Sequence, residues 1–78
     1  MIFLYTDPKT QLVYDIWVVY VVYGGDKIHQ VIVGVAKKSW KIYRGIVNGN
    51  VRWRRDDKKV PDNVRQFVSR VLKLQTFA

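Results

Sequence analysis

The chain has 78 residues and a formal net charge of +8, with 49% hydrophobic residues, 14% aromatic residues and no cysteine. This length fits one small domain, so we expect residues 1–78 to form a single domain. The absence of cysteine excludes disulfides and thiolate metal sites, and one histidine is too few for an ordinary zinc site. We therefore expect no metal and no cofactor, and we expect tight packing or self-association to stabilise the fold.

Five strands are expected in chain order, at residues 2–6, 11–23, 27–36, 39–47 and 50–55, because Val and Ile dominate this part of the chain. The first strand ends at a turn that contains Pro8. The pair Gly24-Gly25 accepts positive φ angles, which is typical of a tight turn. Asn48-Gly49 is a strong hairpin signal between the last two strands.

An amphipathic helix is expected over residues 60–74. Its apolar residues recur at spacings of three and four, namely Val60, Val64, Phe67, Val68, Val71 and Leu72. Pro61 suits a first helical turn, and Asp62 and Lys73 suit the two ends of the helix dipole. The predicted fold class is α+β, with a four- to five-stranded antiparallel sheet, flat or curled like a barrel, and one C-terminal helix packed on one face.

The second predicted strand is apolar on both of its faces. One short helix can cover only one face, and strands buried on both sides have this pattern. Either the sheet curls into a small barrel or a second subunit covers the open face, because a large uncovered apolar patch is unusual on a monomer. Of these alternatives, a homodimer is the one we expect.

The positive charge is concentrated in one segment. Residues 37–59 carry nine Lys and Arg residues against Asp56 and Asp57. Such a patch attracts phosphate backbones or anionic membrane surfaces. For the two Asp residues we favour capping of the helix approach and local charge neutralisation over a magnesium site.

A two-residue turn at Asn48-Gly49 predicts which hairpin residues share a face. The face expected to meet the core holds Trp40, Ile42, Arg44, Ile46, Val51, Trp53 and Arg55. The face expected to be wet holds Lys41, Tyr43, Gly45, Val47, Arg52 and Arg54. This division makes Trp40 and Trp53 core aromatics, with Arg44 over the Trp53 ring, and leaves Tyr43 as the candidate for stacking on a base.

We therefore expect a non-sequence-specific nucleic-acid-binding protein, with DNA or RNA as the partner. The expected site residues are Lys37, Lys38, Lys41, Tyr43, Arg52, Arg54 and Arg55. The alternatives are a merely solvated basic face and a protein-interaction module that assembles through the apolar sheet face. We expect no small-molecule substrate.

Few residues are available for catalysis. The chain has no Cys or Glu, and His29 is its only conventional base near neutral pH. No trio of nucleophile, base and orienting group is present, so we expect no enzyme. An RNA cleaver that uses only Lys, Arg and Tyr remains an alternative.

The start of the chain, MIFLYTDPKT, lacks the features of a secretory signal. The apolar run at residues 16–23 is shorter than the roughly 20 residues of a spanning helix. We expect a cytoplasmic protein without a membrane partner, located in the host cytoplasm if the chain is viral.

The segments KKSWKIYRG and VPDNVRQFVSRVLK give the chain a layout of strands followed by a closing helix. In this layout it resembles the small basic chromatin proteins of archaea and the dimeric single-strand-binding transcription coactivators. The resemblance implies nucleic-acid binding, and it transfers no site residue. Archaeal viruses and mobile elements also encode many small proteins of this composition.

Overall fold

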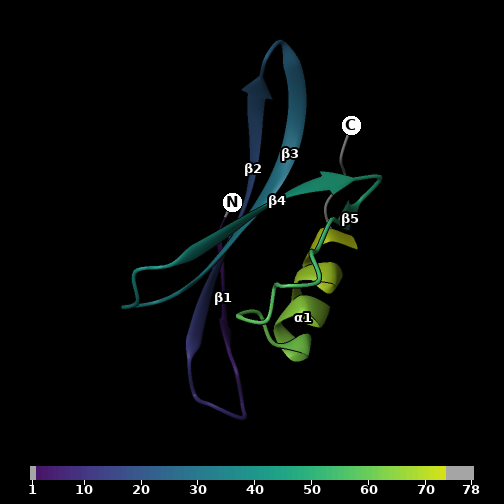
Figure 1. Cartoon of the computed structure of the whole chain (residues 1–78). Coiled ribbons are helices and arrows are strands. Elements are labelled where there is room, and N and C mark those ends of the chain that lie inside the picture. The colour runs from purple at the N-terminus through teal and green to yellow at the C-terminus, as the bar shows by residue number, and fades with distance from the viewer. Residues whose placement is uncertain (1, 74–78) are drawn as a thin grey trace.

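The computed structural model describes residues 2–73, with only the backbone described at residues 23 and 27 (Figure 1). The elements are β1 (Ile2–Thr6), β2 (Val13–Tyr23), β3 (Asp26–Val35), β4 (Lys41–Val47), β5 (Asn50–Val51) and α1 (Asp62–Lys73). The strands form one antiparallel sheet in the order β1-β2-β3-β4-β5. The sheet is curled into a half-barrel, and the helix follows it, which confirms the predicted α+β class.

The last strand is shorter than predicted. The hairpin register is as expected, with Val47 opposite Asn50 and Ile46 opposite Val51, but β5 ends at Val51. The Arg52 amide still donates to the Gly45 carbonyl at 3.0 Å. In a continued ladder, the Arg54 amide would be the next to bond β4. It donates instead to the Asp57 carboxylate at 2.7 Å, which draws the chain away from β4. The predicted strand over residues 52–55 is therefore wrong.

The helix lies within the segment that the apolar spacing predicts. It begins at Asp62 and is described to Lys73, while the predicted end at Leu74 lies outside the described residues. The Pro61 carbonyl accepts hydrogen bonds from the amides of Val64 and Arg65, both at 3.0 Å. Pro61 therefore stands immediately before the first helical residue, where its missing N–H costs nothing.

The core lies between α1 and the concave face of the half-barrel. Its fully buried sheet residues include Ile16, Val31 and Val33, each with 0% exposure. The helix contributes Val64, Val68, Val71 and Leu72, which form one apolar stripe. Because α1 has one such stripe, it covers one face of the sheet, and none of the described elements covers the other.

The first turn and the helix are tied together by the buried Asp7 carboxylate. It accepts hydrogen bonds from the Lys9 amide and the Thr10 hydroxyl, both at 3.0 Å, and from the Asn63 amide group at 2.7 Å. The Lys9 amide bond, helped by those of Asn63 and Thr10, holds the pKa of Asp7 below its ordinary value against the effect of burial. Tyr5 adds a ring contact to Phe67, with centroids 4.6 Å apart. These contacts fix β1 beside α1.

The face of the sheet that points away from α1, here called the outer face, is largely apolar on β1 and β2. Ile2 is 49% exposed, Leu4 68% and Trp17 37%. The curling of the sheet therefore does not bury this face. The concave side is also uncovered at the far end of β2, where the β2–β3 hairpin extends beyond the helix (Figure 1) and Tyr20 and Val22 are exposed.

Candidate nucleic-acid interface

Two exposed aromatic side chains lie in one row across the outer face. Trp17 of β2 and Tyr43 of β4 both pair with Ile32 of β3, one from each side. Strands in a sheet are about 4.8 Å apart, so the two aromatic residues stand roughly 10 Å apart along this row. Tyr43 is 52% exposed, and Trp17 is fixed by a hydrogen bond from its indole nitrogen to Asp15 at 3.1 Å.

Cations flank the aromatic row on both sides. Lys41 lies two residues before Tyr43 on the same face, and its Nζ atom is 5.6 Å from the Trp17 ring centroid. Gly34 makes room for this approach, because a Cβ atom there would lie 3.1 Å from Lys41 Cγ and from the Trp40 carbonyl oxygen. On the other side of the row, Arg52 lies opposite Gly45 and is exposed.

A depression of about 410 Å³ lies where β5 ends beside β4. It is lined by Tyr43, Arg44, Gly45, Arg52, Trp53 and Arg54. No heavy atom lies within 4 Å of the position that a Cβ atom of Gly45 would occupy. The depression thus has cations in its lining and free space beside Gly45, which lies on the face that the sequence predicts to be wet.

The structure brings together only part of the predicted site. Lys41, Tyr43, Arg52 and Arg54 are exposed residues of the outer face or of the depression. The other members are exposed, but they neither belong to a strand nor line the depression. Lys37 and Lys38 are in the β3–β4 turn, and Arg55 is in the connection to α1, where strand alternation no longer applies.

The connection between β5 and α1 is held to the sheet by an ion pair between Arg44 and Asp57. Arg44 Nε donates to Asp57 Oδ2 at 2.9 Å, and a second guanidinium nitrogen bonds the other carboxylate oxygen. This bond from Arg44 holds the pKa of the Asp57 carboxyl below its ordinary value, although burial opposes it. The Asp57 carboxylate is therefore neutralised locally by Arg44 and also accepts from the Arg54 amide, whereas Arg44 does not lie over Trp53 as predicted.

Trp40 and Trp53 are half-buried and pack against the core, as predicted. A cation lies over each ring, although neither is the one expected. Lys59 Nζ is 5.8 Å from the Trp40 centroid, and the Arg65 guanidinium carbon is 5.6 Å from the Trp53 centroid. Arg65 comes from α1, so the Trp53 contact joins the helix to the end of the hairpin.

Sequence reasoning missed two groups of residues. Trp17 was expected only as part of an apolar face, and its pairing with Ile32 identifies it as the neighbour of Tyr43 across the sheet. The second group comprises the helix cations Arg65, Arg70 and Lys73, of which the sequence predicted only the dipole position of Lys73. Their spacings of five and three residues, outside the apolar stripe, could have placed them on the solvated side of the helix.

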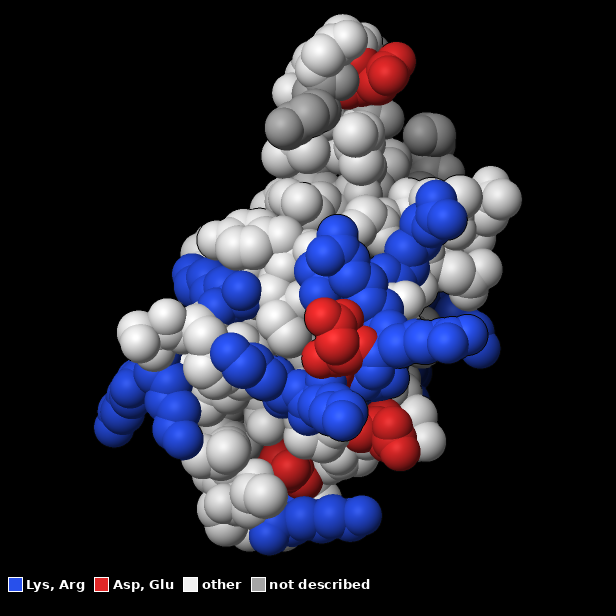
Figure 2. Space-filling model, viewed as in Figure 1, with Lys and Arg blue, Asp and Glu red and all other residues white. Residues whose placement is uncertain are grey.

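Positive charge is also visible on the helix side of the molecule. Figure 2 shows Lys and Arg side chains gathered over α1 and the chain that leads to it, while the described side chains of the projecting β2–β3 end include none. The formal charge is thus concentrated on the part of the molecule that contains the hairpin and the helix.

Other kinds of site have little support in residues 2–73. No group of three or more potential metal ligands occurs among these residues. The His29 ring contacts Tyr20 on the concave side, with centroids 5.3 Å apart. None of the helical segments in this part of the chain is long and apolar enough to cross a membrane.

Comparison with known proteins gives no relative: no family model, no curated protein and no solved structure matches the chain significantly.

Proposed function

We propose that the protein binds single-stranded nucleic acid, without sequence specificity, on the outer face between β2 and β5. The observation that carries this proposal is the row of Trp17 and Tyr43 with Lys41 and Arg52 on either side. Aromatic side chains on a sheet stack with bases of any identity, and neighbouring cations neutralise the phosphates. Phosphate contacts carry no base information, so little preference among sequences is expected.

Folding stability alone gives no reason for this arrangement. Neither Arg52 nor Arg54 has a carboxylate within ion-pair distance among the described residues, so their clustering forms no ion pair that would stabilise the fold. An exposed Tyr43 beside them adds apolar surface that a merely solvated face does not need. A ligand with stacked rings and negative charges would satisfy both features.

The test is fluorescence anisotropy of labelled single- and double-stranded oligonucleotides at about 50 and 200 mM salt. The double variant Arg52→Glu, Arg54→Glu should weaken binding about 100-fold at the lower salt, since each lost phosphate contact accounts for roughly tenfold there. Arg52→Glu alone should cost about tenfold, whereas Lys9→Glu, the same charge change on the distant β1–β2 turn, should cost less than about threefold.

Three results would overturn the proposal. Absence of binding at low salt would remove the function. Full binding by the double variant would remove the site assignment. A preference for duplex, or equal displacement by heparin, would show that charge acts alone and that no base stacks on the aromatic row.

A second function, as a protein-interaction module that forms a homodimer, is favoured by the exposed Ile2 and Leu4 beside Trp17. A two-fold axis through this part of the outer face would pack the apolar residues of β1 and β2 against themselves and leave the cations of β4 at the rim. Because Trp17 belongs to both surfaces, Leu4→Asp is the variant that separates the two functions. It should convert a dimer to a monomer in sedimentation analysis, while oligonucleotide binding to the monomer persists.

A further inference from the structure

A second cationic cavity lies between Trp53 and the solvated side of α1. This groove has a volume of about 470 Å³. It is lined by Trp53, Arg65, Gln66, Ser69, Arg70 and Lys73. The helix residues follow at intervals of one, three, one and three, which places them on the side of α1 opposite to the buried Val64, Val68 and Leu72.

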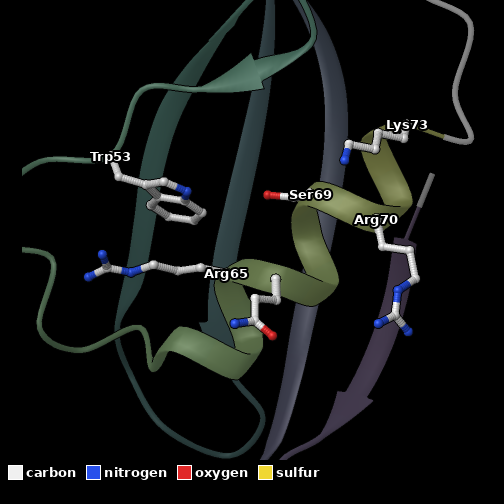
Figure 3. A pocket seen from close by; sticks show the side chains of 6 residues that line it. Trp53, Arg65, Ser69, Arg70 and Lys73 are labelled. Carbon is white, nitrogen blue, oxygen red and sulfur yellow. The ribbon is translucent and has the colours of Figure 1, made fainter.

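Hydrogen-bond donors converge in this groove. Figure 3 shows the nitrogen-bearing edge of the Trp53 ring facing Ser69 of the helix, with the Lys73 amine on the same side. The indole N–H and the ammonium are donors only, and the hydroxyl can also donate. Arg70, although it contributes to the lining, directs its guanidinium to the other side of α1 (Figure 3).

The wall formed by Trp53 is held in place by Arg65. The Arg65 Nε atom donates to the Val60 carbonyl at 3.1 Å, and a second guanidinium nitrogen bonds the Asp57 carbonyl. These bonds place the guanidinium over the Trp53 ring. The ring and its donor edge are therefore positioned before any ligand arrives, which reduces the ordering that binding requires.

The lining includes three cations and no carboxylate. The dipole of α1 explains why Arg70 and Lys73 are favourable in its last turn. It does not explain why a tryptophan edge, a serine hydroxyl and a lysine amine face one open space. A ligand that only accepts hydrogen bonds and carries negative charge fits this set of donors.

We propose that the groove between Trp53 and α1 binds a phosphate group through Trp53 Nε1, Ser69 Oγ and Lys73 Nζ. Trp53 also lines the depression on the hairpin, so one nucleic-acid strand can cross the Trp53 edge and place a phosphate in each of the two cavities. This path of a nucleic-acid strand through both cavities rests on the proposed function. A terminal phosphate of a nucleotide or inorganic phosphate has the same chemistry and is the other source of ligand.

The experiment follows the three indole N–H signals in a ¹H–¹⁵N correlation spectrum, with the Trp53 signal assigned from Trp53→Phe. Inorganic phosphate, a 5′-nucleotide and a thymidine hexamer are titrated separately; the hexamer has no terminal phosphate and carries only its internucleotide phosphates. The Trp53 signal should shift with each phosphate-bearing ligand. Lys73→Gln should abolish this shift and weaken hexamer binding about 3- to 10-fold at 50 mM salt. Lys9→Gln, with the same loss of charge, should preserve the shift and change binding less than twofold.

The outcomes separate this inference from the proposed function. If the hexamer shifts the Trp17 signal and leaves that of Trp53 unchanged, the outer face binds nucleic acid and the groove does not. If inorganic phosphate shifts the Trp53 signal while the hexamer does not bind, the groove binds phosphate from a free source and the path for a strand is overturned. A Trp53 signal that none of the three ligands moves, or a Lys73→Gln variant that shifts as the parent does, overturns the phosphate site. Ser69→Ala is a helix-compatible change at an exposed position. Like Lys73→Gln, it should make the ligand-induced shift of the Trp53 signal smaller than in the parent.

Discussion

The concave and outer faces of the sheet differ in what covers them, although both are apolar along β2. Ile16 is fully buried beneath the helix, while its neighbour Trp17 on the outer face is 37% exposed. Hydrophobicity alone does not distinguish these two residues. The single apolar stripe of α1 does, because it can be buried against one face only. The outer face therefore keeps aromatic and aliphatic groups available for a ligand or a partner.

The largest predicted difference between the faces is in folding stability. Ile16→Ala should lower the free energy of unfolding by about 3 kcal/mol, since it opens a cavity in the core. Leu4→Ala, at a position that is 68% exposed, should change it by less than about 0.5 kcal/mol. Urea unfolding followed by tryptophan fluorescence measures both values.

A milder substitution at the same position keeps this comparison measurable if Ile16→Ala is too unstable to fold. Ile16→Val should cost about 1 kcal/mol and retain the transition. A large loss of stability in Leu4→Ala, with a midpoint that depends on protein concentration, would contradict an uncovered face. It would show instead that a second copy buries β1, as the homodimer proposal requires.

The next effect concerns the ion pair that holds the connection to the sheet. Asp57→Ala should destabilise the protein by roughly 2–3 kcal/mol, because it leaves Arg44 without its partner and removes the acceptor for the Arg54 amide. Asp56→Ala, one residue earlier and at an exposed position, should change stability by less than about 0.5 kcal/mol. Equal losses of stability for the two variants in chemical denaturation would show that negative charge in this connection stabilises the protein, whereas the Arg44–Asp57 ion pair itself does not.

Acid should weaken the same contact. The folded-state pKa of Asp57 lies below the unfolded value of 3.8, so the unfolded chain binds the proton more readily. The stabilisation is therefore complete above pH 3.8 and is lost as the pH falls through the folded pKa. Asp7 has a lowered pKa and contributes in the same direction. Asp57→Ala should unfold with a shallower acid dependence than the parent, and an unchanged acid profile would contradict the lowered pKa.

Much of this fold follows from local patterns in the sequence. The Asn48-Gly49 turn sets the hairpin register, and that register assigns Tyr43 and Arg52 to the wet side and Ile46 to the core. The apolar spacing after residue 59 predicts the helix. These elements could be predicted because each depends on neighbours within one hairpin or one helical turn.

The contacts that were predicted wrongly or not at all depend on residues far apart in the chain. Arg44 bonds Asp57 and not Trp53, because the hairpin ends early and the connection folds back on β4. The row of Trp17 and Tyr43 requires the registers of β2 and β4 against β3 together. The helix groove requires the position of α1 relative to Trp53, which no local period encodes.

The smallest effect is the one that tests the depression most directly. Gly45 has space around its missing Cβ atom, and a glycine within a strand is less stable than a β-branched residue there. Gly45→Val should therefore raise the free energy of unfolding by about 0.5–1 kcal/mol while its side chain fills part of the depression. If the bound nucleic acid enters the depression, Gly45→Val should weaken binding of a single-stranded oligonucleotide about 5- to 10-fold, although no charge has changed. Gly45→Ala should have an intermediate effect. Opposite signs in stability and affinity cannot result from partial unfolding. An oligonucleotide that binds Gly45→Val as tightly as the parent would show that the ligand contacts the cations of the depression alone, and the outer face would then be an electrostatic surface without a stacking site.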